Sequence, residues 1–302
     1  MNFSVDHIRH LYDFQSHYLD LEGHRYHYLD EGQGEPVVMV HGNPSWSFMY
    51  RELVCSLRKT HRVIAPDHMG CGLSDKPDSS QYEHTLERRA GDLEQLLDQL
   101  GVTSNITLVV HDWGGPIGMR FAVRHPDRIA RLVIFNTAAF LLPEAKNLHW
   151  SLLFARNSRL AAFLILKFNA FARVATYMGC RSKRMPREIR RAYAGPYDSS
   201  KNRLATLAFV RDIPFSPSDP AYAPLQEVQE KLGRFQQTPM LICWGEQDFA
   251  FDLDFLEEWI KRFPEAQVHR FPEAGHYVLE ELPERVIPLV KEFLENHNPQ
   301  GQ

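Results

Sequence analysis

Residues 108–118 read LVVHDWGGPIG, and this segment decides the fold. Residues 106–110 are β-branched or otherwise mostly apolar, which is typical of a buried strand in a parallel sheet. Gly114 and Gly115 follow at the start of an apolar pattern with helical spacing. We therefore predict a sharp strand-to-helix turn centred on Asp112. At such a turn one strained residue projects above the sheet, and the next backbone N–H faces a developing oxyanion.

Two further segments place polar residues at predicted strand ends. The apolar residues 37–40 lead into an HGNP turn at 41–44, a usual place for a second oxyanion-hole N–H. Residues 240–245 form another apolar run with Asp248 just beyond it, and His276 follows the last predicted strand. The chain order nucleophile, acid, histidine is that of the α/β-hydrolase fold. We predict this fold, with a mostly parallel eight-stranded sheet.

The composition is that of an ordinary globular protein. Of the 302 residues, 44% are hydrophobic and 24% are charged, and the formal net charge is −4. This charge gives no reason to expect nucleic acid as a partner. The four cysteines lack a C-x-x-C pair, and the N-terminal residues lack an apolar signal segment, so we expect reduced thiols and a cytoplasmic location.

The pattern of alternating strands and helices is interrupted once. From about residue 138 to 224 no buried strand is predicted, and the sequence is helical and rich in arginine. We predict a helical cap inserted after the sixth strand. The domain prediction is a first core part at 1–137, the cap at 138–224 and a second core part at 225–302.

Three residues are candidates for catalysis. Asp112 is ionised at neutral pH without a base, so it needs positioning more than activation, and it is suited to attack an sp³ carbon bearing a leaving group. His276 is the candidate base for a water molecule, and Asp248 is the candidate to orient its ring. Glu246 and Asp252 lie close to Asp248 in sequence and are the other acids available.

The chain resembles the haloalkane dehalogenase family over essentially its whole length. The motifs are the elbow, the HGNP turn, WGEQD at 244–248 and AGHY at 274–277. More narrowly it resembles the third subgroup of that family, which includes the β-lactone decarboxylases of bacterial long-chain olefin biosynthesis. The segments that carry this closer match are PDHMGCGLSDKP (66–77), VHDWGG (110–115), FNTAAF (135–140) and LICWG (241–245).

The resemblance implies functions for two more residues. It implies that the indole N–H of Trp113 and the amide N–H of Asn43 bind a departing halide or developing negative charge. Some dehalogenases place the catalytic acid after the sixth strand, but this chain has Asn136-Thr137 there, which favours Asp248. We expect no metal and no cofactor, because no histidine has a partner at ligand spacing.

Three functions stay open at this point. The resemblance implies decarboxylation of a long-chain cis-β-lactone to a cis-alkene, or hydrolysis of a haloalkane to an alcohol and halide. A ligand receptor or scaffold with a hydrolase fold is the non-enzymatic alternative. Residues 160–166 are apolar almost all round and are predicted to form a lid over a hydrophobic substrate. With the neighbouring arginines, this segment is also a candidate docking site for a membrane surface or for a β-lactone synthetase.

Overall fold

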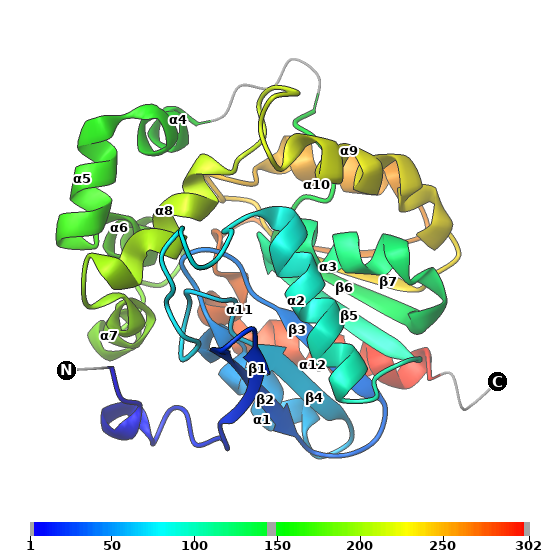
Figure 1. Ribbon diagram of the computed structural model, residues 1–302. Coiled ribbons are helices and arrows are strands. Elements are labelled where there is room, and N and C mark those ends of the chain that lie inside the picture. Colours follow the sequence, from blue (N-terminus) through cyan, green and yellow to red (C-terminus); the bar gives the residue numbers. More distant parts are fainter. Residues whose placement is uncertain (1–2, 144–148, 299–302) are drawn as a thin grey trace.

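The computed structural model describes residues 3–143 and 149–298 and contains one eight-stranded sheet (Figure 1). The strand order is β1-β2-β4-β3-β5-β6-β7-β8, in which β1, β2 and β4 pair antiparallel and all other neighbours pair parallel. The predicted mostly parallel eight-stranded sheet is therefore confirmed. The strands are β1 (His17–Leu21), β2 (His24–Glu31), β3 (Pro36–Val40), β4 (Arg62–Pro66), β5 (Ile106–Asp112), β6 (Ile129–Thr137), β7 (Met240–Gly245) and β8 (Gln267–Phe271).

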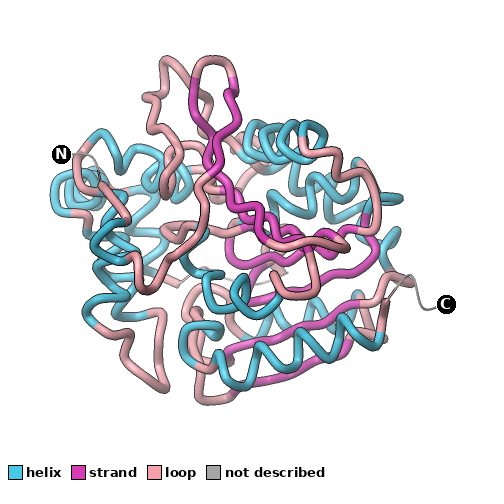
Figure 2. The backbone as a smooth tube through the Cα atoms, turned by 90° about the horizontal axis from the view of Figure 1, so that it is seen from below, coloured by secondary structure: helices cyan, strands magenta, loops and turns pink. Residues whose placement is uncertain are grey.

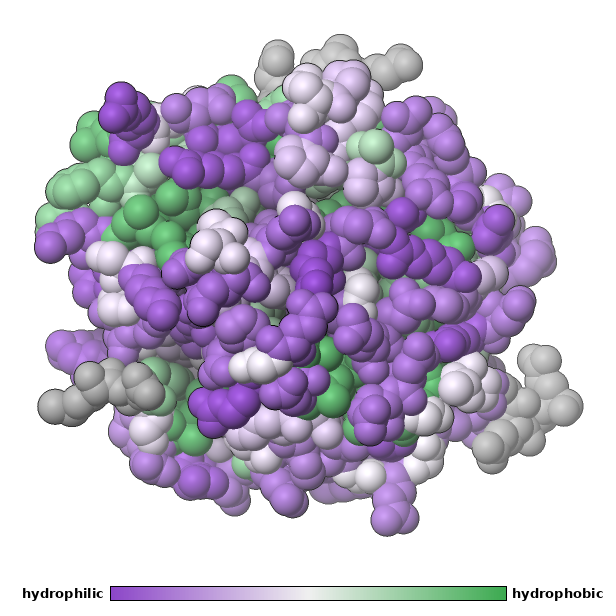
Figure 3. Space-filling model, in the orientation of Figure 1, coloured by the Kyte–Doolittle hydropathy of each residue, from purple (hydrophilic) through white to green (hydrophobic). Residues whose placement is uncertain are grey.

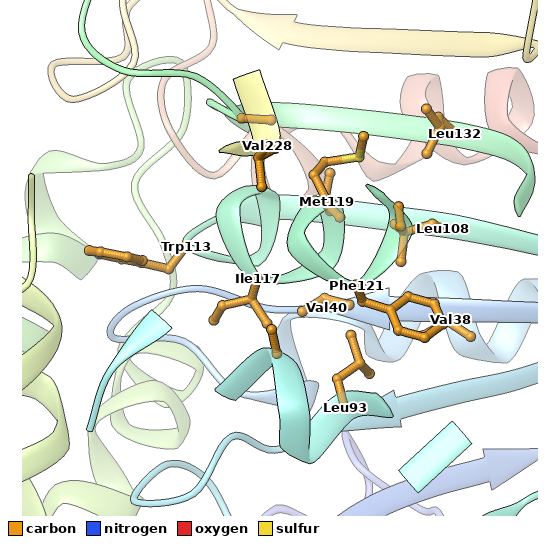
Figure 4. Packing of buried hydrophobic residues seen from close by; sticks show 14 of the residues in the cluster. Val38, Val40, Leu93, Leu108, Trp113, Ile117, Met119, Phe121, Leu132 and Val228 are labelled. Carbon is orange, nitrogen blue, oxygen red and sulfur yellow. The ribbon is translucent and has the colours of Figure 1, made fainter. Parts of the chain in front are cut away.

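Helices cover both faces of the sheet, as Figure 2 shows. Alternate residues of each strand face opposite sides. Val38 and Val40 of β3 pack in the cluster that includes α2, α3, α9 and α10, whereas Val37 and Met39 pack with α1 and α12. Figure 4 shows the first cluster around α3. These helices are α1 (Arg51–Leu57), α2 (Leu86–Gln99), α3 (Gly114–Arg124), α9 (Tyr222–Lys231), α10 (Leu253–Arg262) and α12 (Pro283–Asn296), and the short α11 (Val278–Glu281) precedes α12.

Five further helices lie between β6 and α9 and form a layer beside the sheet (Figure 1). They are α4 (Trp150–Asn157), α5 (Arg159–Phe168), α6 (Ala170–Met178), α7 (Arg187–Ala194) and α8 (Leu204–Arg211). We call this layer the cap. The predicted boundary at residue 224 falls inside α9, which contacts α3. The three domain ranges stay a prediction, and they include residues 1–2, 144–148 and 299–302, which lie outside the described residues.

Short 3-10 helices complete the secondary structure. They span Asp6–Ile8, Ser47–Tyr50, Pro126–Arg128, Gly195–Tyr197, Lys201–Arg203 and Leu232–Phe235. Within residues 3–143 and 149–298, no single helix has the length and apolar composition needed to cross a bilayer. Helices α5 and α6 reach that composition only as a pair, which bends by 88°.

Candidate active site

Asp112 lies at the sharp turn predicted between β5 and α3. Its φ of 52° is in the left-handed region, which is unfavourable for a residue with a Cβ. The helix that follows approaches the sheet so closely that only glycine fits: a Cβ on Gly114 would lie 1.9 Å from the carbonyl oxygen of Val40, and one on Gly115 would lie 1.9 Å from Thr137 Oγ1. The two glycines explain how a strained aspartate is held at the end of the strand.

The HGNP turn after β3 lies directly against this aspartate. The backbone N–H of Asn43 donates to Asp112 Oδ1 at 2.6 Å. A Cβ on Gly42 would lie 2.1 Å from the same oxygen, so glycine is needed for this close approach. The segment after β4 also holds the turn in place, because the N–H of His68 donates to His41 Nε2 at 3.0 Å. This turn therefore places a backbone N–H on the Asp112 carboxylate, and its role as an oxyanion-hole donor stays a prediction.

The environment of Asp112 raises the pKa of its carboxyl group, and a backbone N–H group holds the carboxylate in place. Burial raises the pKa of the carboxyl, while the His276 imidazole and the N–H groups of Asn43 and Trp113 act in the opposite direction. Its Oδ2 lies 3.8 Å from His276 Nε2, which is longer than a hydrogen bond. The carboxylate is thus positioned by backbone donors, and one of its oxygens lies on the His276 side.

His276 is placed between the two predicted carboxylates. Its Nδ1 is 2.8 Å from Asp248 Oδ2, and its ring stacks on Phe251 with centroids 6.0 Å apart. Burial alone lowers the pKa of His276, but the carboxylates of Asp248 and Asp112 outweigh burial and leave it above the usual value. The pair therefore fixes the ring with Nε2 facing Asp112, which is the orientation that a base at this position needs.

Asn136, at the end of β6, is a residue of the site for which the sequence analysis predicted no role. Its amide Nδ2 donates to Asp248 Oδ2 at 3.0 Å and to the carbonyl of Gly245 at 2.9 Å, and its Oδ1 accepts the N–H of Gly245 at 2.9 Å. The N–H of Ala250 donates to the other Asp248 oxygen at 2.7 Å. Asn136 therefore ties the acid-bearing loop to the neighbouring strand. The sequence offered one indication of this role, because Asn136 lies after the sixth strand, where some dehalogenases have their catalytic acid.

Glu281, at the end of α11, is a second residue that sequence reasoning missed. Its Oε1 accepts the N–H of Gly275, the residue before His276, at 2.6 Å. Its Oε2 accepts the N–H of Arg181 at 2.7 Å, and it also accepts both the N–H at 2.6 Å and the hydroxyl at 2.7 Å of Ser182. This buried carboxylate therefore joins the histidine loop to the cap.

Above Asp112 lies an apolar cavity of about 110 Å³. The side chains of Asn43 and Trp113 reach it together with Asp112, as predicted, whereas Asp248 and His276 are not among the residues that line it. The cap contributes Leu152, Phe171 and Val210, from α4, α6 and α8. The other lining residues are Pro116, Ala138, Phe140, Leu142, Ile213, Pro214, Leu225, Ala250, Phe251 and Phe255.

The lid predicted from residues 160–166 differs from the structure. Among the described residues, none from α5 lines the cavity. The buried side of α5 packs against α8 instead, through Ala162 and Ile165, which cluster with Leu207 and Val210. The reason is geometric: α5 is the outer helix of the cap, and α8 lies between it and the site. The apolar sequence of α5 is therefore not explained by the cavity.

The side-chain N–H groups of Asn43 and Trp113, which are the two predicted donors, differ in whether they already make a hydrogen bond within the protein. One amide hydrogen of Asn43 donates to the carbonyl of Thr206 in α8 at 3.2 Å, which fixes the side chain against the cap. The Trp113 ring contacts Phe209 with centroids 5.5 Å apart. Figure 4 shows it extending away from the core residues of α3. No hydrogen bond to its indole N–H is found in the described part of the chain. Their binding roles stay predictions.

A second buried acid and imidazole pair lies outside the cavity. His27 Nδ1 is 2.8 Å from Asp67 Oδ2, and both side chains are fully buried. Asp67 also accepts the N–H groups of Ser47 and Leu73. This pair holds loops together, and neither of its residues lines the cavity over Asp112. The residues 3–143 and 149–298 contain no group of three or more side chains suited to hold a metal ion.

Three features define an α/β-hydrolase-fold protein with an aspartate at the nucleophile position. They are the strand-to-helix turn at Asp112, the HGNP turn at 41–44 and the pair of Asp248 and His276. The family model for the alpha/beta hydrolase fold matches residues 35–283, so the chain belongs to this family. The chain is 53% identical to the cis-3-alkyl-4-alkyloxetan-2-one decarboxylase of Shewanella oneidensis, across 94% of this chain and 89% of that protein. It is 46% identical to the protein of the same name from Xanthomonas campestris, across 95% of this chain and 98% of that protein.

Haloalkane dehalogenases are similar at lower identity. The chain is 33% identical to one from Mycolicibacterium paratuberculosis, across 91% of this chain and 92% of that protein. A crystal structure of a variant of the dehalogenase DatA from Agrobacterium tumefaciens superimposes with a TM-score of 0.84 at 25% identity, covering 95% of this chain and 99% of that one. The predicted resemblance to this family and to its lactone decarboxylases is therefore confirmed.

Proposed function

We propose that this enzyme converts cis-3-alkyl-4-alkyloxetan-2-ones, which are β-lactones, into cis-alkenes and carbon dioxide. The observation that carries the proposal is the ionisable carboxylate of Asp112, held by backbone donors at the floor of an apolar cavity. The identity to two proteins named for this reaction supports the choice of substrate. All four cysteines are free, which fits the reducing cytoplasm expected from the sequence.

The reaction is a fragmentation that needs no water. An Asp112 oxygen attacks the sp³ ring carbon that is bonded to the ring oxygen. A new C–O bond forms there, the bond from that carbon to the ring oxygen breaks, and the lactone group is released as a carboxylate that stays attached to the neighbouring carbon. The resulting ester then loses carbon dioxide: the C–CO₂ bond breaks, its electron pair forms the C=C bond, and the Asp112 carboxylate leaves. Atoms and charge balance, and Asp112 returns to its starting form.

The stereochemistry fits this sequence of steps. Displacement inverts the attacked carbon, and loss of the two groups from opposite sides then gives the same alkene as direct loss from one side of the ring. A cis-lactone therefore gives a cis-alkene. The N–H groups around Asp112 stabilise the carboxylate as a leaving group in the second step.

His276 decides whether water completes a different reaction. Esterification removes the charge of Asp112, one of the two carboxylates that raise the pKa of His276. The pKa of His276 then falls, so more of the ring is neutral and able to accept a proton from water. Hydrolysis of the ester would give an alcohol, as in a haloalkane dehalogenase. This second candidate is favoured by the His276–Asp248 contact of 2.8 Å, which decarboxylation does not require.

The size of the cavity bears on the substrate. About 110 Å³ is roughly the share of four water molecules in the liquid. This space accommodates the reacting ring and the first chain carbons, and the longer parts of the alkyl chains would lie against the apolar residues that α4, α6 and α8 contribute. The apolar lining leaves few polar groups to solvate a leaving carboxylate besides Asn43 and Trp113, which are the residues we propose for that role.

The test is one preparation assayed with a dialkyl cis-β-lactone and with a short bromoalkane, each with the wild type and His276→Ala. The proposal predicts alkene from the lactone, with His276→Ala retaining a measurable part of this activity. A bromoalkane would leave His276→Ala with an alkyl ester on Asp112, visible by mass spectrometry. Hydroxy acid in place of alkene would refute decarboxylation, and no reaction with either substrate would favour the receptor or scaffold alternative.

A further inference from the structure

The outer face of the cap exposes large apolar side chains. Trp150 of α4 is 72% exposed, and Leu160 and Tyr177 of α5 and α6 are 58% and 60% exposed. Phe154, Phe163 and Phe168 also face outward. Val174 of α6 is exposed as well, and in the rest of the described chain only Tyr18 and Leu253 are large, hydrophobic and exposed. Figure 3 shows hydrophobic residues gathered on this side of the molecule, over α4, α5 and α6. We call these helices the outer cap face.

The segment that contains α5 and α6 carries an excess of positive charge. Between residues 159 and 191 the only acidic residue is Glu188, although the whole chain has a net charge of −4. Within the described residues, the exposed basic side chains of this segment form no ion pair. Among them are Arg159, Lys167, Arg173, Arg181, Arg184 and Arg187. The combination of exposed aromatic residues and unpaired cations is typical of a surface that lies in the headgroup region of an anionic membrane.

The shape of the outer cap face is fixed by the protein itself. Asn169, at the corner between α5 and α6, has a φ of 55°, and its amide donates to the carbonyl of Ala194 at 3.2 Å. Arg203 donates to the carbonyls at the end of α5, with 2.6 Å to Leu166 and 3.1 Å to Lys167. These bonds hold the apolar residues outward. The bend of 88° also gives a pair of helices that lie in a plane instead of one that spans a bilayer.

We propose that the outer cap face docks on an anionic lipid surface. A second copy of this chain is disfavoured as the occupant, because a symmetric contact would bring the same cations together. The inner sides of α4 and α6 carry Leu152 and Phe171, which line the cavity over Asp112. A docked enzyme thus has the membrane on one side of these helices and the catalytic cavity on the other. The docking itself does not depend on the proposed function.

The test is sedimentation of the full chain with vesicles. Vesicles of phosphatidylcholine with about one third phosphatidylglycerol are expected to carry the protein down at low salt, and pure phosphatidylcholine vesicles to bind it far more weakly. The cap variant substitutes Arg159, Lys167 and Arg173, which are exposed on α5 and α6, together by Gln. It is expected to lower the partition coefficient about 100-fold, since each basic residue near the surface contributes about fivefold. The matched control substitutes the exposed Lys59, Lys261 and Lys291, which lie outside the cap, and is expected to bind as the wild type does.

Trp150 provides a direct readout of the docked face. The other tryptophans, Trp46, Trp113, Trp244 and Trp259, are buried. Vesicles with brominated acyl chains are therefore expected to quench the protein through Trp150, and Trp150→Phe to remove that quenching while vesicle binding persists. Equal loss of binding in the cap variant and in the control variant would overturn the proposal. Vesicle binding without quenching of Trp150 would also overturn it. The same holds if the chain does not bind vesicles and instead binds a β-lactone synthetase through this face. Thermal melting of each variant checks that it is folded.

Discussion

Substitution of Glu281 by Gln tests how the histidine loop is held. The amide oxygen can take the place of Oε2, where three donors converge, but the amide NH₂ then faces the N–H of Gly275. The N–H of Gly275 loses its acceptor and the new NH₂ group has none, at about 1–3 kcal/mol for each of these two buried donors. We expect a loss of about 4 kcal/mol in the free energy of unfolding. At about 2 °C per kcal/mol for a chain of this size, the melting temperature should fall by about 8 °C.

The activity of this variant should fall as well, because Gly275 directly precedes His276. A displacement of a catalytic group by about 1 Å can cost 10²-fold in rate. The measurements are urea denaturation, thermal melting and the rate of product formation below the melting temperature. Glu284→Gln is the matched control, since this exposed residue follows three positions later and undergoes the same change of charge. If the two variants are equally stable, the account of Glu281 is wrong.

Three further predictions follow from particular contacts. Burial raises the pKa of Asp212 to about 6, so its ionised form costs stability above that pH, and the cost disappears below the unfolded value near pH 4. Asp212→Asn should therefore be more stable than the wild type by about 3 kcal/mol at pH 7 and by less than about 1 kcal/mol at pH 4, as measured by urea denaturation. Gly42→Ala places a Cβ 2.1 Å from Asp112 Oδ1 and should lower the rate at least about 100-fold, whereas a rate within twofold would contradict the reading of this contact. Asn136→Ala removes three hydrogen bonds around Asp248 and should destabilise the fold by about 3 kcal/mol; an unchanged melting temperature would show that these bonds contribute little.

The sheet and the position of the elbow could be predicted from the sequence because both leave local patterns. Each buried strand is a short apolar run, and the turn at Asp112 is followed by two glycines that the close packing requires. Asp248 and His276 were found because each follows a predicted strand, and parallel strands bring their ends to the same edge of the sheet. The structure places His276 beside Asp112, and it places Asp248 on the other side of the His276 ring.

The supporting residues could not be predicted in the same way. Glu280 and Glu281 are adjacent and chemically identical, yet Glu280 pairs with Arg51 and Tyr193 while Glu281 binds the histidine loop and the cap. Their partners are far away in sequence, so no local pattern separates them. The lid prediction for residues 160–166 was wrong for a related reason, because hydrophobicity alone does not say whether a helix faces a cavity or the outside.

The central claim is that the carboxylate of Asp112 is the nucleophile. The most direct measurement is a single turnover of a dialkyl cis-β-lactone with excess Asp112→Asn enzyme, in which alkene is quantified against the wild type. The amide has nearly the same shape, so the fold and the cavity should persist, and the account predicts that alkene formation falls by about 10⁴-fold or more. Alkene formation within tenfold of the wild-type rate would contradict the account.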